Sequence, residues 1–124
     1  MTTPTMIIQA RTRHLPEHLP SDSDKYAFAY KMTITNPNKF PVTLMTRYWL
    51  ITDANGKTSE VQGEGVIGEQ PQIAPGDTFQ YTSGAVVDTP VASMEGYYEL
   101  ELENGERFKA DIDAFRLAVP HIIN

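Results

Sequence analysis

Hydrophobic and polar residues alternate along much of this chain with a period of two. In the segment 26–35, YAFAYKMTIT, bulky apolar side chains fall at every second position and small or polar ones fall between them. Successive side chains of a β-strand point to opposite faces, so this pattern predicts a strand with one buried face. The segment 97–102, YYELEL, alternates in the same way, with Tyr98, Leu100 and Leu102 in the apolar phase.

Further strands are expected in the segments 6–12 (MIIQART), 42–53 (VTLMTRYWLITD) and 78–83 (TFQYTS). The second of these is rich in β-branched and aromatic residues, and it is long enough for a strand with a bend or a bulge. Its apolar residues occur in both phases, which is typical of a strand that is covered on both faces. No window of the sequence shows the sustained apolar stripe of an amphipathic helix.

Glycine-containing dipeptides mark the turns between these segments. Asn55-Gly56 and Asn104-Gly105 predict hairpins with type I′ turns, in which both central residues have positive φ. Pro75-Gly76 has the residue order of a type II turn. About seven strands with regular turn signals predict an all-β fold, an antiparallel β-sandwich of the fibronectin type III or immunoglobulin-like kind.

The ends of the chain are less regular. Residues 15–25, LPEHLPSDSDK, hold two prolines and several polar residues, and they predict a mobile surface loop. The tail 114–124, AFRLAVPHIIN, is apolar, so we expect it to pack along the sandwich. The length of 124 residues fits a single domain, 1–124, that folds without a disulfide or a metal ion.

Charge and composition narrow the possible partners. The net charge of −6 repels phosphate backbones, and the cationic residues are scattered, so we expect no binding to nucleic acid. The absence of cysteine removes thiol nucleophiles and thiolate metal sites, and it fits a reducing compartment. The start of the chain does not resemble a secretory signal, and no apolar stretch approaches the ~20 residues that span a bilayer. We therefore expect a cytoplasmic protein with no membrane contact.

The segment GEGVIG matches the G-x-G-x-x-G pattern of dinucleotide-binding loops through Gly63, Gly65 and Gly68. In those proteins a helix follows the glycines, and its N-terminal amides hold the pyrophosphate. Here two prolines stand where the helix would run, and glutamates surround the glycines. The pattern therefore favours a strand-connecting loop, with an anion-binding nest of glycine amides as the alternative.

Other catalytic or metal-binding candidates have less support. The histidines are His14, His18 and His121, and Pro16 interrupts the helical spacing of the first two, so we expect no metal site there. Ser83-Gly84 does not match the G-x-S-x-G pattern of a nucleophile elbow, because residues 81 and 85 are not glycines. We expect no catalytic residues, no enzymatic activity and no cofactor.

Four residues are candidates for a surface that binds a protein partner. They are Arg47, Tyr48, Trp49 and Arg116, chosen because Arg and large aromatic residues are enriched at interaction hot spots. Packing in the core is the other interpretation of Trp49, since a Trp in a central strand of a sandwich is usually buried. For the remaining three the other interpretation is local packing or ordinary surface charge.

Several blocks of the sequence together resemble the bacterial ApaG proteins. In order they are RYWLITDANGK, EVQGEGVIGEQPQIAPGDTFQYTSGAVVDTP, SMEGYYEL, ENGERF and AFRLAVP. The resemblance covers most of the chain from about Tyr26 onward, includes the three glycines at 63, 65 and 68, and implies a fibronectin-III-like sandwich. ApaG-like domains in larger eukaryotic proteins, including F-box proteins and a polymerase-interacting protein, are regarded as protein-interaction modules. Bacterial members lie near genes for diadenosine tetraphosphate hydrolysis and are linked to cobalt and magnesium resistance.

Two hypotheses of function follow. In the first, the chain is a non-enzymatic β-sandwich that binds a protein partner, not yet identified, through its strand edges and loops. In the second, it is a small-ligand protein that binds phosphorylated nucleotides, pyrophosphate or a divalent metal ion.

Overall fold

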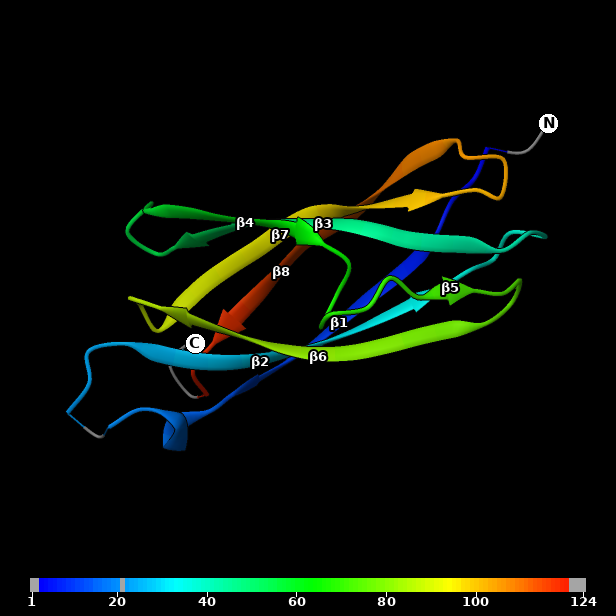
Figure 1. Cartoon of the computed structure of the whole chain (residues 1–124). Helices are drawn as coiled ribbons and strands as arrows, with labels where there is room; N and C mark the ends of the chain where they lie inside the picture. The colour runs from blue at the N-terminus through cyan, green and yellow to red at the C-terminus, as the bar shows by residue number, and fades with distance from the viewer. Residues whose placement is uncertain (1–2, 21, 121–124) are drawn as a thin grey trace.

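The computed structural model describes residues 3–20 and 22–120. These residues form eight β-strands in two antiparallel sheets, together with a 3₁₀ turn at Pro16–His18 (Figure 1). The strands are β1 (Ile7–His14), β2 (Tyr26–Thr35), β3 (Val42–Asp53), β4 (Thr58–Glu64), β5 (Gln72–Ile73), β6 (Thr78–Val87), β7 (Val91–Glu101) and β8 (Arg107–Ala118). The predicted antiparallel sandwich is confirmed, with one strand more than expected.

The two sheets form the two layers seen in Figure 1. One has the strand order β1-β2-β6, and the other has the order β4-β3-β7-β8, with the short β5 also paired to β3. On one flank of the sandwich β1 meets β8, where Thr12 Oγ1 donates a hydrogen bond of 3.3 Å to the backbone oxygen of Arg116. On the other flank the edge strands are β4 and β6. The sandwich is therefore bordered by β1 and β8 on one flank and by β4 and β6 on the other.

The core lies between the sheets and holds the side chains that the alternation predicts. Phe28, Met32 and Ile34 of β2 are buried, as are Tyr98 and Leu100 of β7. These side chains come from both layers, and burying them is the main favourable contribution to folding. The apolar phases of segments 26–35 and 97–102 are thus confirmed as core faces.

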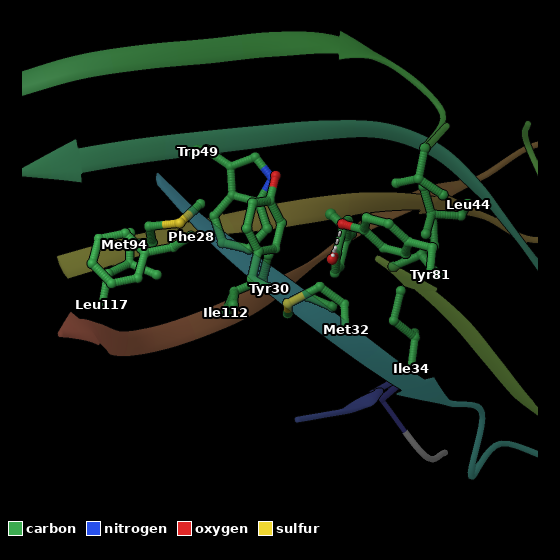
Figure 2. Close-up of a cluster of buried hydrophobic side chains, with 14 of the residues drawn as sticks. Phe28, Tyr30, Met32, Ile34, Leu44, Trp49, Tyr81, Met94, Ile112 and Leu117 are labelled. Carbon is green, nitrogen blue, oxygen red and sulfur yellow. Dashed lines mark hydrogen bonds between the residues drawn. The ribbon is translucent and has the colours of Figure 1, made fainter. Parts of the chain in front are cut away.

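Trp49 occupies the centre of this core and is only 1% exposed. Its indole lies edge-on to the rings of Tyr30, Tyr98 and Phe115, with ring centroids 5.3, 6.3 and 5.7 Å away. Figure 2 shows Trp49 and Tyr30 together between the layers. Edge-to-face pairs of this kind add roughly 0.5–1.5 kcal/mol each beyond the burial of area. The interpretation of Trp49 as a core residue is confirmed, and its side chain is not part of an exposed surface.

A β-bulge in β3 decides which of its side chains face the core. The register of β3 with β7 shifts between Leu44 and Thr46, which makes Met45 the extra residue. One extra residue exchanges the two faces of a strand beyond it, so Trp49 points inward and Tyr48 points outward. The prediction that both faces of this strand are covered is wrong for the described residues, where no further layer lies over the outer face.

The hairpins predicted at the two Asn-Gly sites are present, but their turns are of another type. Only the glycines, Gly56 and Gly105, have positive φ (87° and 88°), whereas a type I′ turn requires it at the asparagines too. In the first hairpin Gly56 N donates to Asp53 O, and Asp53 N donates to Lys57 O, both over 3.0 Å. The loop therefore has three residues, a type I turn closed by a left-handed glycine, and the asparagine can keep an ordinary negative φ.

The remaining local predictions concern one turn and the two ends. At Pro75-Gly76 the type II turn is confirmed, since the glycine has a φ of 80° and the surrounding residues close the turn. Apart from the 3₁₀ turn, no helix or strand occurs within the described part of residues 15–25. The tail packs as expected up to Val119, with Leu117 buried and Pro120 exposed, while residues 121–124, including His121, lie outside the described residues. None of the helices in the described part of the chain is long and apolar enough to cross a membrane.

A hydrogen bond between two tyrosines joins the sheets inside the core. Tyr81 of β6 and Tyr98 of β7 bring their hydroxyl oxygens to 2.6 Å from each other. Burial raises the pKa of both hydroxyls above the ordinary value of 10.0, because the interior disfavours a phenolate. Both pKa values are higher in the folded chain than in the unfolded chain. The contribution of the tyrosine pair to stability is therefore fully present below pH 10.0 and is lost as the pH rises above it.

Removing either hydroxyl alone should be costly. We expect Tyr81→Phe or Tyr98→Phe to lower the free energy of unfolding by about 1–3 kcal/mol, because the hydroxyl that remains is buried without its partner. The double variant should lose less than the sum of the two, since both polar groups are then absent. Urea unfolding of the parent and the three variants measures these losses, and strictly additive losses would contradict the pairing.

Candidate functional site

The glycine motif forms a tight turn after β4. Val66 and Glu69 exchange backbone hydrogen bonds of 2.8 and 2.9 Å, and Ile67 and Gly68 lie between them. These two central residues have φ values of 49° and 75°, so the turn has the positive φ values of type I′. The next regular element is the strand β5 and not a helix. The interpretation of the motif as a strand-connecting loop therefore agrees with the structure.

Each glycine of the motif is required for a different structural reason. Gly63 lies opposite Arg47 in the sheet, and a Cβ there would come within 2.8 Å of Nη1 of this arginine. Gly65 has a φ of 63°, and a Cβ there would overlap the backbone oxygen of Glu69. Gly68 has open space around it, but its φ of 75° belongs to the turn. Backbone geometry and one arginine thus account for the whole pattern.

Two successive amides of the loop already donate inside the protein. Gly65 N donates to Met45 O over 2.8 Å, and Val66 N donates across the turn to Glu69 O. Gln70 Nε2 adds a second hydrogen bond of 3.0 Å to Met45 O. An anion nest requires successive amides that are free to point at one ligand. Gly65 N instead holds the bulge of β3 and Val66 N closes the turn, so neither of these two amides is free to hold a pyrophosphate.

Arg47 lies on the inner face of β3. Its Nη1 donates to the backbone oxygens of Glu64 and Gly65 over 3.2 and 2.9 Å. Within the part of the chain that the structure describes, the ion pairs do not include Arg47. The guanidinium is therefore fixed by carbonyls of the glycine loop, and its charge has no carboxylate partner among those residues.

Tyr48 lies on the opposite face of the same strand. Its ring stacks on Tyr97 of β7, with centroids 5.1 Å apart and an angle of 25° between the rings. The Tyr48 hydroxyl donates to Glu60 Oε2 over 2.7 Å, and this hydrogen bond raises the pKa of the hydroxyl. Lys109 Nζ lies 4.5 Å from the centre of the Tyr97 ring. A tyrosine pair edged by charged groups thus occupies the outer face of this sheet.

The four candidates for a partner surface do not form one patch, although Arg47 and Tyr48 border the same hollow. Arg47 and Trp49 face inward and Tyr48 faces outward, while Arg116 is exposed on β8 at the flank where β8 meets β1. Sequence reasoning missed Tyr97, which belongs to the polar phase of its segment and is the direct neighbour of Tyr48 across β3 and β7. Its position opposite Tyr48 follows from strand pairing and from the bulge, which the sequence pattern alone does not specify.

The two glycines of the motif that have positive φ, Gly65 and Gly68, should respond differently to alanine. We expect Gly68→Ala to lower the free energy of unfolding by about 1 kcal/mol, the strain of a left-handed residue in open space. Gly65→Ala should cost about 3 kcal/mol, because the carbonyl of Glu69 must also move. Ile67→Asn should stabilise the protein, since asparagine tolerates a φ at which a β-branched residue is strained. Denaturant unfolding checks the order, and equal losses for the two alanine variants would contradict it.

Comparisons with known proteins find relatives that are similar to this chain in sequence and in fold. A family model described as the ApaG domain matches residues 16–102. Protein ApaG of Salmonella arizonae is 49% identical over 124 residues, which are 100% of this chain and 99% of that protein. An X-ray structure of a structural genomics target is 46% identical, with a TM-score of 0.92, over 97% of this chain and 91% of that chain.

A second solved structure, described as that of an ApaA protein from Bordetella pertussis, is 40% identical with a TM-score of 0.90. The match covers 95% of this chain and 96% of that chain. Matches of this extent, in sequence and in fold, show that the chain belongs to the ApaG family.

Proposed function

We propose that this chain is a non-enzymatic protein–protein interaction domain, and that its partner docks on the outer face of the sheet β4-β3-β7-β8. The observation that carries this proposal is the stack of Tyr48 on Tyr97 at the centre of that face. Tyrosine is enriched among the residues that contribute most to binding at protein interfaces. No further layer covers the pair within residues 3–20 and 22–120.

The surface around the tyrosine pair is hollowed on both sides. One hollow runs past Thr46 and Gln62 toward Lys109, and the other runs past Leu50 toward Asp111. Hot-spot side chains usually insert into such depressions next to a rigid aromatic anchor. The face therefore offers an anchor with a depression on either side of it.

The charge of this face indicates the chemistry of the partner. Arg107 is already paired with Glu99 and Glu101, over 2.9 and 3.1 Å. The carboxylates around the tyrosine pair outnumber the cations Arg47, Arg107 and Lys109; they are Glu60, Glu64, Glu95, Glu99, Asp111 and Asp113. Complementary charge steers association and selects partners, and cations also stack favourably on tyrosine rings. The proposed partner is accordingly a basic protein segment that carries Lys or Arg.

The ApaG family is linked to cobalt and magnesium resistance, and the protein partner is the proposed connection of this chain to that resistance. We propose that the domain takes part by binding a protein in the cytoplasm, and that it catalyses no reaction itself. Among the described residues, no group of three or more His, Asp or Glu side chains is placed to hold a metal ion. The support for the proposal is the uncovered tyrosine face and its charge, not this absence.

Affinity capture with matched variants tests the proposal. The bait is the whole chain, and the source is a gentle, low-salt extract of the native cells. We expect a reproducible partner, whose recovery falls by at least about tenfold with the bait Tyr48→Ser/Tyr97→Ser, because both rings are removed. Recovery by the parent bait should also decrease as salt is added, since ionic screening weakens the attraction of a basic segment.

The matched control changes two exposed residues on the outer face of the other sheet. Lys31 and Gln80 lie on neighbouring strands there, as the two tyrosines do on their own sheet. The bait Lys31→Ser/Gln80→Ser should retain the partner. Failure to recover any reproducible partner would contradict the proposal, as would equal recovery by the tyrosine variant and by this control.

A further inference from the structure

The flank between the edge strands β4 and β6 contains a cleft that reaches the core. The cleft has a volume of about 340 Å³, which lies within the range of roughly 300–1,000 Å³ of small-ligand sites. Ser59 and Val61 line it from β4, and residues 83–86 line it from β6. Val61 and Val86 are 40% and 56% exposed, although both are apolar. The two layers are therefore not sealed against each other along this flank.

The charged groups near the cleft are distributed unevenly. Next to one end, Asp88 pairs with Lys25 and Lys57 over 2.6 and 3.0 Å, so these two lysines already have a carboxylate partner. Among the described residues that line the cleft itself, Arg47 alone is charged. Gly63, opposite Arg47 in the sheet, leaves the guanidinium its room. The cleft thus combines apolar walls with one cation.

Two donor groups that line this cleft lack protein acceptors among the described residues. Trp49 Nε1 is buried without a hydrogen-bond partner, which is rare for a polar atom in a native core. Arg47 commits Nη1 to the two loop carbonyls, which leaves Nε and Nη2. In Figure 2 the indole nitrogen of Trp49 lies at the same end of the two rings as the hydroxyl of Tyr30, which also lines the cleft.

A ligand with a carboxylate group can accept hydrogen bonds from all of these donors. The fork of Nε and Nη2 matches its two oxygens, and lone pairs remain for an indole N–H. Arg47 and Trp49 are two residues apart on one strand face, about 7 Å along the strand, so a single ligand can reach both. A single negative charge is favoured over a phosphate dianion, because the net charge of −6 repels the dianion more strongly.

We propose that the cleft binds a small monocarboxylate with an apolar body. The carboxylate lies on Arg47 and accepts from Trp49 Nε1, and the apolar body lies between Val61 of β4 and Ala85 of β6. This site is on the inner face of β3, and its Arg47 also borders the hollow beside the stacked tyrosines. It goes beyond the proposed protein docking and does not depend on it.

The single tryptophan of the chain gives a direct readout. In a ¹H–¹⁵N spectrum of the whole protein, 4-methylpentanoate should shift the Trp49 indole signal saturably, with a dissociation constant on the order of 1 mM. Removing one methylene, in 3-methylbutanoate, should weaken binding roughly fourfold. The neutral 4-methylpentanamide should bind at least about tenfold more weakly, because the charge-assisted hydrogen bonds are lost.

Two charge-matched variants locate the site. Val61→Glu places a carboxylate into the cleft from the exposed edge strand, and it should weaken 4-methylpentanoate binding at least about tenfold by competition for Arg47. Gln80→Glu adds the same charge on the outer face of the other sheet, away from the residues that line the cleft, and should bind as the parent does. The dispersion of the remaining amide signals shows whether each variant is folded.

Several results would overturn the proposal. They are an indole signal that does not move, equal binding by the two glutamate variants, and amide binding as tight as carboxylate binding. Tighter binding of 3-methylbutyl phosphate would replace the carboxylate by a phosphate ligand, and shifts confined to the neighbours of Tyr97 would place the ligand on the outer face. Because partner capture is tested with variants of Tyr48 and Tyr97, the two proposals can fail separately.

Discussion

The backbone oxygen of Met45 accepts hydrogen bonds from Gly65 N and Gln70 Nε2, over 2.8 and 3.0 Å, and much of this structure depends on that interaction. Met45 is the extra residue of the β3 bulge, and the bulge determines the face on which every later residue of the strand lies. Without it, Tyr48 would face the core and Trp49 would face solvent. The glycine loop that supplies Gly65 also supplies the carbonyls that hold Arg47. One loop therefore fixes both the register of the central strand and the position of its arginine.

The same strand then presents two surfaces of different chemistry. On the outer face, Tyr48 and Tyr97 form a rigid aromatic anchor among carboxylates, which suits a basic protein segment. On the inner face, the arginine and an indole N–H that has no partner among the described residues line a cleft at the open flank. The structural role of the glycine motif thus differs from that of a phosphate-binding loop. The amide of Gly65 binds the protein's own bulge, and the bare α-carbons of the motif make room for an arginine and for a tight turn.

Sequence reasoning predicts the parts of this structure that depend on local pattern. The alternation in 26–35 identifies a core face, and Pro75-Gly76 identifies its turn, because periodicity and φ preferences are properties of short segments. The apolar residues in both phases of 42–53 predict a strand that is covered on both faces. They occur in both phases because a bulge exchanges the two faces of the strand, and not because a second layer covers it. The partner of Tyr48 and the inward direction of Arg47 depend on the pairing of distant strands, which no single segment encodes. The prolines after the glycine motif exclude a helix and so predict a turn there, but the contact of the motif with Arg47 has no local signature.

A double-mutant cycle between Gly63 and Arg47 tests most directly whether this glycine serves the arginine. In the parent protein, Gly63→Ala should lower the free energy of unfolding by about 1 kcal/mol, because the new Cβ pushes Nη1 away from its two carbonyls. In the Arg47→Ala background the same change should be neutral, or stabilising by about 0.5–1 kcal/mol, as expected when alanine replaces glycine inside a strand. Urea unfolding of the four proteins should therefore give a coupling energy of about 1–2 kcal/mol. Equal effects of Gly63→Ala in both backgrounds would contradict the account.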